Sequence, residues 1–314
     1  MKLHGTDGLG LDSFVNHLHG FGYKGTACQL GEGVLTAGLE VGQKSSLMGV
    51  RYTVDREFLF VGDCDTTKQV FAVMEPGSTS RYHGATSVGT DICGFRSSLT
   101  TTDCSWTGAM RCLYVPKGMV EHAAELAGAK IAVQRLNGTN SVKIPPQAVE
   151  TFIRLHQQLL DGTLGHEDQF ISFLVLQLCQ GNDRPCSIKN PSTRNHHELT
   201  EMVRFLHTKR HGEPLPVTEW AKHLDISEST LRISCKRRFD CSPIELHQRI
   251  RLTQAFIDLE DGIKDVGPVM AKHKFRNGGQ FAKQFYNLFG VLPSSFKKPT
   301  PIGEATQLSI PFAA

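Results

Sequence analysis

Hydrophobic residues are spaced differently along the two halves of this chain, and the spacing predicts strands first and helices afterwards. From about residue 14 to residue 143, short runs rich in Val, Leu, Phe, Thr and Ser are interrupted by frequent glycine. That pattern is typical of strands joined by turns. Five runs have the length of a strand, namely 45–54, 57–62, 69–74, 93–99 and 110–115. The segment 1–144 is therefore expected to form a β-rich sandwich or barrel rather than alternating strands and helices.

The spacing of apolar residues changes after Pro145 and Pro146. Apolar residues then recur at helical spacing, and a second helix is expected over 167–179. The turn between them makes a helical hairpin of the segment 145–180, whose apolar faces pack either within one chain or against a second copy. The polar stretch 181–193 is expected to be an interdomain linker. The residues of the first helix that carry the period are Val149, Phe152, Ile153, His156 and Leu160.

A helix-turn-helix pattern follows at 215–239. Trp220, Ala221 and Leu224 form one apolar stripe on a short helix, and Ser227 is placed to cap the next helix. The second helix continues with Leu231, Cys235 and Phe239 at intervals of four, which gives it a buried face.

The opposite face of that second helix carries polar and basic side chains that could reach base edges and phosphates. The alternative is a plain helical hairpin whose basic face is only solvated. The residues of this face are Ser229, Arg232, Ile233 and Lys236, with Arg237 beside them.

A second helix-turn-helix pattern at 265–296 favours the functional interpretation, and a helical stretch at 242–259 joins it to the first. Two such units coupled rigidly can enter successive major grooves on one face of DNA. The discriminating feature is the spacing of Phe275, Phe281, Phe285, Phe289, Gly290, Pro293 and Phe296.

Together with the segment 251–259 of the joining helix, this spacing resembles the DNA-binding domain of the AraC/XylS family of bacterial transcription regulators. The resemblance covers about residues 198–298, and it implies a double helix-turn-helix domain over 194–298 with a short tail at 299–314. Three positions depart from the family pattern. Met270 stands where the family usually has a small residue, Lys274 where it has Gly, and Gly279 where it commonly has Ser.

The resemblance also implies which residues face the bases. In the first unit they fall on Ser229, Arg232, Ile233 and Lys236. In the second unit they fall on Gly279, Gln280 and Lys283, and Asn277 is the expected helix cap. From helix geometry, Ile233 suits contact with a thymine methyl group and Gln280 suits pairing with adenine.

Charge is distributed unevenly and supports the same interpretation. Residues 192–299 contain 18 Lys and Arg against 12 Asp and Glu, a formal charge of +6, whereas the rest of the chain carries −3. A basic excess confined to this segment suits phosphate contacts, which make affinity fall steeply with salt.

For the N-terminal part the resemblance implies a cupin-like effector domain, so the fold class expected is α+β. The apolar interior of such a domain can hold a small molecule, and the alternative is a packed sandwich used for dimerisation or partner contact. The implied partners are double-stranded promoter DNA, a small-molecule effector, RNA polymerase and a second copy of the chain. The resemblance implies an activator, while the sequence itself leaves activation and repression both open.

Other classes of protein find little support. No apolar run approaches the length of a membrane helix, and the first residues lack an apolar signal core. The nine cysteines show no paired spacing, as expected of thiols in a reducing cytoplasm. Hydrolase, metalloprotease, P-loop and dinucleotide motifs are absent from the sequence, so neither an enzyme, a metal site nor a cofactor is expected. His4, His17 and His19, or Cys104 and Cys112, lack a recognised metal-ligand spacing.

Two alternatives stay open. One is a DNA-binding regulator that acts without a small ligand, through protein contacts or through redox sensing by a reactive cysteine. Cys235 lies in the most basic surroundings, beside Lys236, Arg237 and Arg238, but on the expected core face. The other is an interaction protein whose helices merely resemble a helix-turn-helix.

Overall fold

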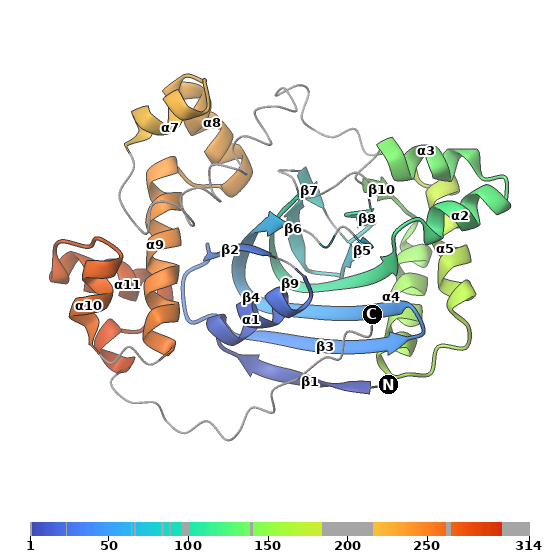
Figure 1. Ribbon diagram of the computed structural model, residues 1–314, viewed down its shortest axis with the longest axis horizontal. Coiled ribbons are helices and arrows are strands. Elements are labelled where there is room, and N and C mark those ends of the chain that lie inside the picture. Colours follow the sequence, from blue (N-terminus) through green and yellow to red (C-terminus); the bar gives the residue numbers. More distant parts are fainter. Residues whose placement is uncertain are drawn as a thin grey trace.

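A curved sheet lies at the centre of the molecule in the computed structural model, with helices on either side of it (Figure 1). Helices of the segment 119–180 lie on one side of the sheet and the C-terminal helices on the other. The fold is thus a β-rich N-terminal part followed by a helical C-terminal part. The residues that the structure describes are 2–22, 24–63, 65, 67–82, 85–87, 89–95, 101–138, 141–183, 216–261 and 265–296.

Eleven strands within those ranges form one sheet, and every pairing is antiparallel. Its order is β1-β3-β4-β9-β5-β8-β10-β11, with β2 beside β4, β6 beside β9 and β7 beside β6. The strands are β1 (Lys2–Leu9), β2 (Lys24–Gln29), β3 (Ala37–Lys44), β4 (Leu47–Asp63), β5 (Lys68–Met74), β6 (Thr79–Tyr82), β7 (Ala85–Ser87), β8 (Asp91–Cys93), β9 (Thr101–Pro116), β10 (Ser141–Lys143) and β11 (Asn182–Asp183).

Two long strands, β4 and β9, pair along their whole length and form the spine of the sheet. One half of β4 pairs with β3 and the other half with β2, so the sheet changes direction along the spine. The expected strands 45–54 and 57–62 are both parts of β4, and the expected break between them was wrong. A register shift between Val54 and Phe58 takes up the irregularity while the backbone stays extended. Of the expected strand 93–99, Cys93 is the last residue of β8, and residues 96–99 lie outside the described residues.

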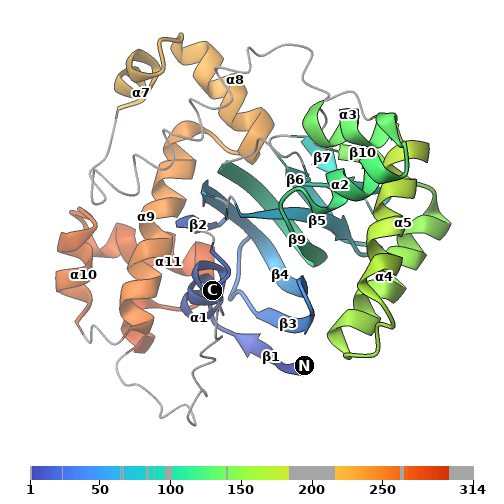
Figure 2. The ribbon, with the colours of Figure 1, turned by 45° about the vertical axis from the view of Figure 1, so that its right-hand side comes forward.

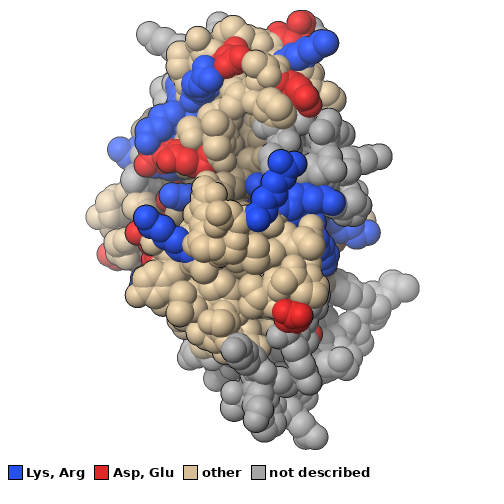
Figure 3. All heavy atoms as spheres, turned by 90° about the vertical axis from the view of Figure 1, so that its left-hand side faces the viewer, with Lys and Arg blue, Asp and Glu red and all other residues tan. Residues whose placement is uncertain are grey.

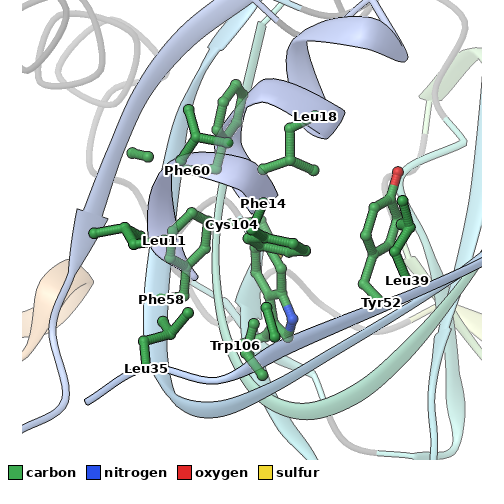
Figure 4. Close-up of a cluster of buried hydrophobic side chains, with 14 of the residues drawn as sticks. Leu11, Phe14, Leu18, Leu35, Leu39, Tyr52, Phe58, Phe60, Cys104 and Trp106 are labelled. Carbon is green, nitrogen blue, oxygen red and sulfur yellow. The ribbon is translucent and has the colours of Figure 1, made fainter. Parts of the chain in front are cut away.

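Helix α1 (Leu11–Gly20) fills the concave face of the sheet, in a segment for which the sequence predicted only strands and turns. Its buried face consists of Leu11, Phe14, Val15 and Leu18. Phe14 is fully buried, with its ring 5.3 Å from that of Phe58, and Phe58 lies 5.1 Å from Trp106 (Figure 4). The interior that was expected to hold a ligand is therefore occupied by the chain's own aromatic side chains.

A further polar pair lies in the same interior. The hydroxyl groups of Tyr52 and Tyr114 are 2.7 Å apart and hydrogen-bonded, and both side chains are buried. Burial raises the pKa of Tyr52 well above its usual value. One hydroxyl donates to the other, so this buried polar pair is held by a hydrogen bond within the chain itself.

Four helices cover the other face of the sheet: α2 (Met119–Leu126), α3 (Lys130–Gly138), α4 (Pro146–Leu160) and α5 (Glu167–Gln180) (Figure 2). The two helices predicted after Pro145 are present as α4 and α5. The helices α2 and α3 were missed, because the sequence predicted only strands as far as residue 144.

Helix α4 packs very closely on the sheet. A Cβ atom added to Gly42 would lie 2.4 Å from the carbonyl oxygen of Leu159, so only glycine fits there. Nearby, the fully buried His156 donates from Nε2 to the carbonyl of Cys112 and accepts from Arg111 at Nδ1. Burial and the Arg111 charge lower the pKa of His156 to about 3, so its ring is neutral at physiological pH.

The C-terminal helices dock directly on the N-terminal part. One hydrophobic cluster runs from the concave face of the sheet into the C-terminal helices, as far as Phe285 and Phe289. Backbone groups meet as well, since the N–H of Gly33 donates to the carbonyl of Leu288 at 2.9 Å. The backbone N–H of Gln29 also donates to the hydroxyl of Thr253 at 3.2 Å. The linker expected over 181–193 lies largely outside the described residues, as does the tail at 299–314.

None of the helices in the described ranges is long and apolar enough to cross a bilayer.

Candidate nucleic-acid interface

The first unit consists of α7 (Val217–His223) and α8 (Glu228–Phe239). Trp220 and Ala221 on α7 are buried against Leu231 and Cys235 on α8, as the apolar stripes predicted. Ser227 caps α8 by accepting a hydrogen bond from the N–H of Thr230 at 3.1 Å, so the expected cap is confirmed.

A tight turn joins the two helices. The N–H of Ile226 donates to the carbonyl of Ala221, and the N–H of Asp225 donates to that of Lys222. This is a Schellman motif, and it places Asp225 in the left-handed region with φ 52°. The turn fixes the angle at which α8 leaves α7.

Helix α9 (Pro243–Glu260) joins the two units, and its N-terminus is well capped. The hydroxyl of Ser242 accepts from the N–H of Glu245, and the Glu245 carboxylate accepts from the N–H of Ser242. With Pro243 in the first turn, this capping box fixes where the helix begins. The observed range agrees with the helix expected over 242–259.

The second unit consists of α10 (Val266–Lys272) and α11 (Gly278–Phe289). Its turn repeats that of the first unit, because the N–H of Phe275 donates to the carbonyl of Met270 and the N–H of Lys274 to that of Ala271. Asn277 then caps α11 by accepting from the N–H of Gln280 at 2.9 Å, as expected.

The two units match beyond their turns. Both second helices end in a left-handed residue, Asp240 after α8 and Gly290 after α11, and each of these is followed three residues later by proline. The chain therefore contains two units with the same helix, turn, helix and C-terminal cap, and α9 joins them. Repetition of the backbone geometry supports one shared role better than either unit alone.

Lys274 carries a strain that the turn of the second unit requires. It has φ 57°, a region that costs a residue with a Cβ about 1–2 kcal/mol. Replacing it with glycine removes that cost but gives the unfolded chain more freedom. We expect K274G to raise the free energy of unfolding by about 0.5–1 kcal/mol, measured by urea denaturation.

Asp225 provides the matched comparison for this prediction. It occupies the same position in the first turn, but Asp adopts left-handed backbone more readily than Lys. D225G should therefore stabilise the protein less than K274G. A loss of stability in K274G would show that the Lys274 side chain makes a contact worth more than the backbone strain.

The outward face of α8 carries the residues predicted to contact DNA. Ser229, Arg232, Ile233, Lys236 and Arg237 are all exposed, and Ile233 is 68% exposed although it is apolar. The neighbouring Arg238 is buried and belongs to the core instead. Figure 3 shows this side of the molecule, with Lys and Arg side chains spread over it and a few acidic ones between them.

Two of these cations form local ion pairs. Arg232 lies 2.8 Å from Glu228, and Lys236 lies 2.9 Å from Asp240, both at helical spacing. Lys236 lowers the pKa of Asp240, with Arg81 adding a smaller effect. Exposed pairs of this kind are weak, so they do not prevent these side chains from contacting phosphate.

The corresponding face of α11 is also exposed at Gly279, Gln280 and Lys283. Arg276 is exposed just before the cap of this helix, and Lys222 is exposed at the end of α7. These two cations were not singled out from the sequence, although exposed Arg and Lys side chains are a usual source of phosphate contacts.

An aromatic cluster holds α11 in place. Phe281, Phe285 and Phe289 are buried on one face of the helix. The Phe285 ring lies 4.7 Å from that of Phe289 and 5.8 Å from Phe256 on α9. The phenylalanine spacing in the sequence therefore corresponds to the buried face of α11.

Arg251 of α9 holds the turn between α10 and α11 in place. Its guanidinium donates two hydrogen bonds to the carbonyl of His273, at 3.0 and 2.7 Å, and lies 4.2 Å above the ring of Phe275. This arrangement satisfies a carbonyl at the end of α10 and couples α10 to α9.

The buried cysteines among the described residues lack the features of a redox sensor. Cys28, Cys93, Cys104, Cys112, Cys235 and Cys241 are buried and none of the described cysteines forms a disulfide. Burial raises the pKa of Cys235, and raises that of Cys241 to about 12, which is the opposite of an activated thiol. Within the described part of the chain, no three His, Cys, Asp or Glu side chains are grouped to hold a metal ion.

The geometry defines a DNA-binding module made of two helix-turn-helix units. Residues 220–299 match a protein family described as a helix-turn-helix domain, and this region is a domain of the AraC type. No curated protein sequence matches the chain.

Three solved structures illustrate what the chain is similar to. The AraC-like transcriptional activator CuxR is 14% identical, with a TM-score of 0.37, over 81% of this chain and 94% of that one. ToxT from Vibrio cholerae O395 is 8% identical, with a TM-score of 0.32, over 88% and 96%. ToxT from Vibrio cholerae strain SCE256 bound to an unsaturated fatty acid is 10% identical, with a TM-score of 0.30, over 88% and 94%.

Proposed function

We propose that this chain is a sequence-specific transcription regulator of the AraC/XylS family that binds double-stranded DNA through α8 and α11. The observation that carries the proposal is the repeated unit, in which two helix pairs with the same turn each expose one face of the second helix. The stiff helix α9 between them suits two contacts in neighbouring major grooves.

Each exposed face has its own part in this proposal. On α8, Arg232 and Lys236 contact a guanine edge or a phosphate, and the exposed Ile233 packs on a thymine methyl group. On α11, the Gln280 amide pairs with adenine, and Lys283 contacts phosphate. Gly279 leaves room for close approach of the backbone to the DNA.

A small-molecule effector acts, in this proposal, on how the two parts of the chain are docked. The concave face of the sheet is filled by α1, so the contact between the N-terminal part and α9 to α11 offers the better place for control. A ligand that binds the docked arrangement more tightly than an open one shifts the balance between them. The fatty acid bound by one ToxT structure shows a ligand on a similar protein.

The chain acts, we further propose, as a cytoplasmic homodimer that contacts RNA polymerase to activate transcription. The helical layer α2 to α5 is the favoured dimer surface, because it leaves large apolar side chains exposed. Leu126 of α2 is 77% exposed, Ile131 of α3 is 52% exposed and Leu176 of α5 is 47% exposed. Control by cysteine oxidation is disfavoured by the burial of six of the seven described thiols.

The decisive experiment selects DNA from a random-sequence library with the full-length protein and then measures binding to the selected site. We expect an enriched motif with two elements whose centres are about 10 base pairs apart, one for each unit. Binding should survive a scrambled competitor and weaken steeply with salt. Absence of an enriched motif, with binding erased equally by salt and by scrambled DNA, would overturn the proposal.

A further inference from the structure

The second helices of the two helix-turn-helix units, α8 and α11, correspond residue by residue. Ser227 caps α8 and Asn277 caps α11, while Asp240 and Gly290 end the two helices in the left-handed region. Both pairs are separated by 50 positions in the sequence. Each residue of α8 therefore has a counterpart in α11, without an insertion or a deletion. Both helices lie on the left of the molecule in Figure 1.

Burial follows the same correspondence. Over 231–240 and 281–290, burial differs at a single position, where the exposed Arg232 corresponds to the half-buried Ala282. The shared buried positions are Leu231, Cys235, Arg238 and Phe239 on α8, and Phe281, Phe285, Leu288 and Phe289 on α11. The exposed residues of α11 thus occupy the same positions as the predicted DNA contacts of α8.

Two exposed residues of α11 that the sequence had not singled out gain a role from this correspondence. Tyr286 is the counterpart of Lys236, and Asn287 is the counterpart of Arg237. All four side chains are exposed, and Tyr286 is 53% exposed although it is aromatic. A single exposed aromatic residue is common on protein surfaces and indicates nothing alone. Its position opposite Lys236 in the repeat is what points to DNA.

The counterparts differ in charge but share the ability to donate hydrogen bonds. Lys236 and Arg237 are cations, whereas the hydroxyl of Tyr286 and the amide of Asn287 are neutral donors. Tyr and Asn side chains, like Lys and Arg, donate to the phosphate oxygens of DNA. The last turn of α11 can therefore bind the DNA backbone through neutral groups, where α8 offers charged ones.

The place of Tyr286 along α11 favours contact with phosphate over contact with bases. A recognition helix contacts base edges with the residues of its N-terminal part. Gln280 lies in the first turn of α11 and Tyr286 in the last, which places them about 9 Å apart along the helix axis. The major groove is about 8.5 Å deep, so a helix that enters with its first turn brings Tyr286 to the rim, where the phosphates lie.

We propose that Tyr286 and Asn287 bind backbone phosphates beside the bases contacted by α11, and that they position this helix in its groove without adding charge. This role rests on the proposed function, since it needs DNA as the partner. A protein partner fits this face less well, because the other exposed residues on it are small or polar, namely Gly279, Gln280 and Lys283.

The expected consequence is an unequal response of the two units to salt. A cation that contacts phosphate releases counterions from the DNA, and a neutral donor does not. Loss of a cation from α8 should therefore lower both the affinity and its dependence on salt. Loss of Tyr286 or Asn287 from α11 should lower the affinity alone.

The test uses the full-length protein and the DNA site selected from the random-sequence library, with binding measured at several salt concentrations. Y286F removes only the hydroxyl and N287A removes the amide. Each should weaken binding about 10-fold with an unchanged salt dependence, because a hydrogen bond to a charged group is lost. K236A should weaken binding and also lower the salt dependence by about one charge. N137A, at an exposed position of α3 on the other side of the sheet, should change neither.

The substitution Y286K gives a matching gain. It places on α11 the residue that α8 has at the corresponding position. A lysine that meets phosphate there should raise the salt dependence by about one charge. An unchanged salt dependence in Y286K would show that position 286 does not reach the DNA backbone.

Ethylation of single phosphates in the selected site locates the contact. Ethylation of the phosphate that Tyr286 binds should weaken binding of the unaltered protein and have little further effect on Y286F. Urea denaturation of each variant separates a lost contact from a loss of folding. If only one of the two DNA elements has phosphates sensitive to ethylation, α11 makes no backbone contact, and this result needs no variant.

The two proposals can fail separately. Binding of Y286F and N287A with the affinity of the unaltered protein would overturn the role of these residues and leave the proposed function in place. Failure of the unaltered protein to select any DNA site would remove both.

Discussion

The variant F285A should lower the free energy of unfolding by about 3–5 kcal/mol, the range for removing a buried phenylalanine ring. Phe285 is fully buried on α11, and its ring contacts those of Phe281, Phe289 and Phe256 at centroid distances of 5.5, 4.7 and 5.8 Å. It also belongs to the cluster that continues into the N-terminal part. Loss of the ring leaves a cavity at the point where the second unit, α9 and the sheet meet.

Urea denaturation measures this effect, and the next residue supplies the control. Tyr286 lies on the same helix and is 53% exposed. Y286A removes an aromatic ring of similar size, yet it should change the unfolding free energy by only about 0.5 kcal/mol, as is usual at surface positions. If both variants cost the same, the second unit would not be packed as the structure places it.

The double variant R232A/K236A should weaken specific DNA binding by about 2–6 kcal/mol if each side chain contributes the usual 1–3 kcal/mol. Both side chains are exposed on the same face of α8, where their present partners are Glu228 and Asp240. Those exposed pairs are weak and can be exchanged for contacts with DNA. Stability should change little, because neither side chain contributes to the core.

Titration of a selected DNA site at fixed salt, repeated at several salt concentrations, measures the loss. A contact with phosphate lowers the salt dependence by about one charge for each residue removed, whereas a base contact also relaxes the preference at one position. R154A serves as the control, since Arg154 is an exposed cation on α4, on the other side of the sheet. An unchanged isotherm for the double variant would remove α8 from the interface.

The helices of the two helix-turn-helix units were predictable from the sequence because their determinants are local. Ser227 and Asn277 cap helices through side chains three residues from the N–H they satisfy, and Pro243 marks a helix start. The phenylalanine spacing on α11 follows directly from one buried helix face. These features involve neighbours along the chain, so no knowledge of the tertiary structure is needed to recognise them.

The N-terminal part was harder to predict, for an equally physical reason. Helix α1 lies among segments rich in turn-forming residues, and what stabilises it is burial of Phe14 and Leu18 in the concave sheet. Its first turn is completed from a distance, because the carboxylate of Glu260 accepts the N–H of Asp12. Strand β4 continues through residues that suggested a break, since pairing with β9 on both sides holds the backbone extended.

The sequence by itself determined the two repeated units, their caps, the buried and exposed faces of α8 and α11, and the helices α4 and α5. The tertiary structure decided what fills the sheet and how the C-terminal helices dock on it. Helical periodicity and capping act between near neighbours, whereas the hydrogen bond between Asp12 and Glu260 joins residues 248 positions apart. Such contacts depend on the shapes of packed surfaces, which a pattern along the chain does not record.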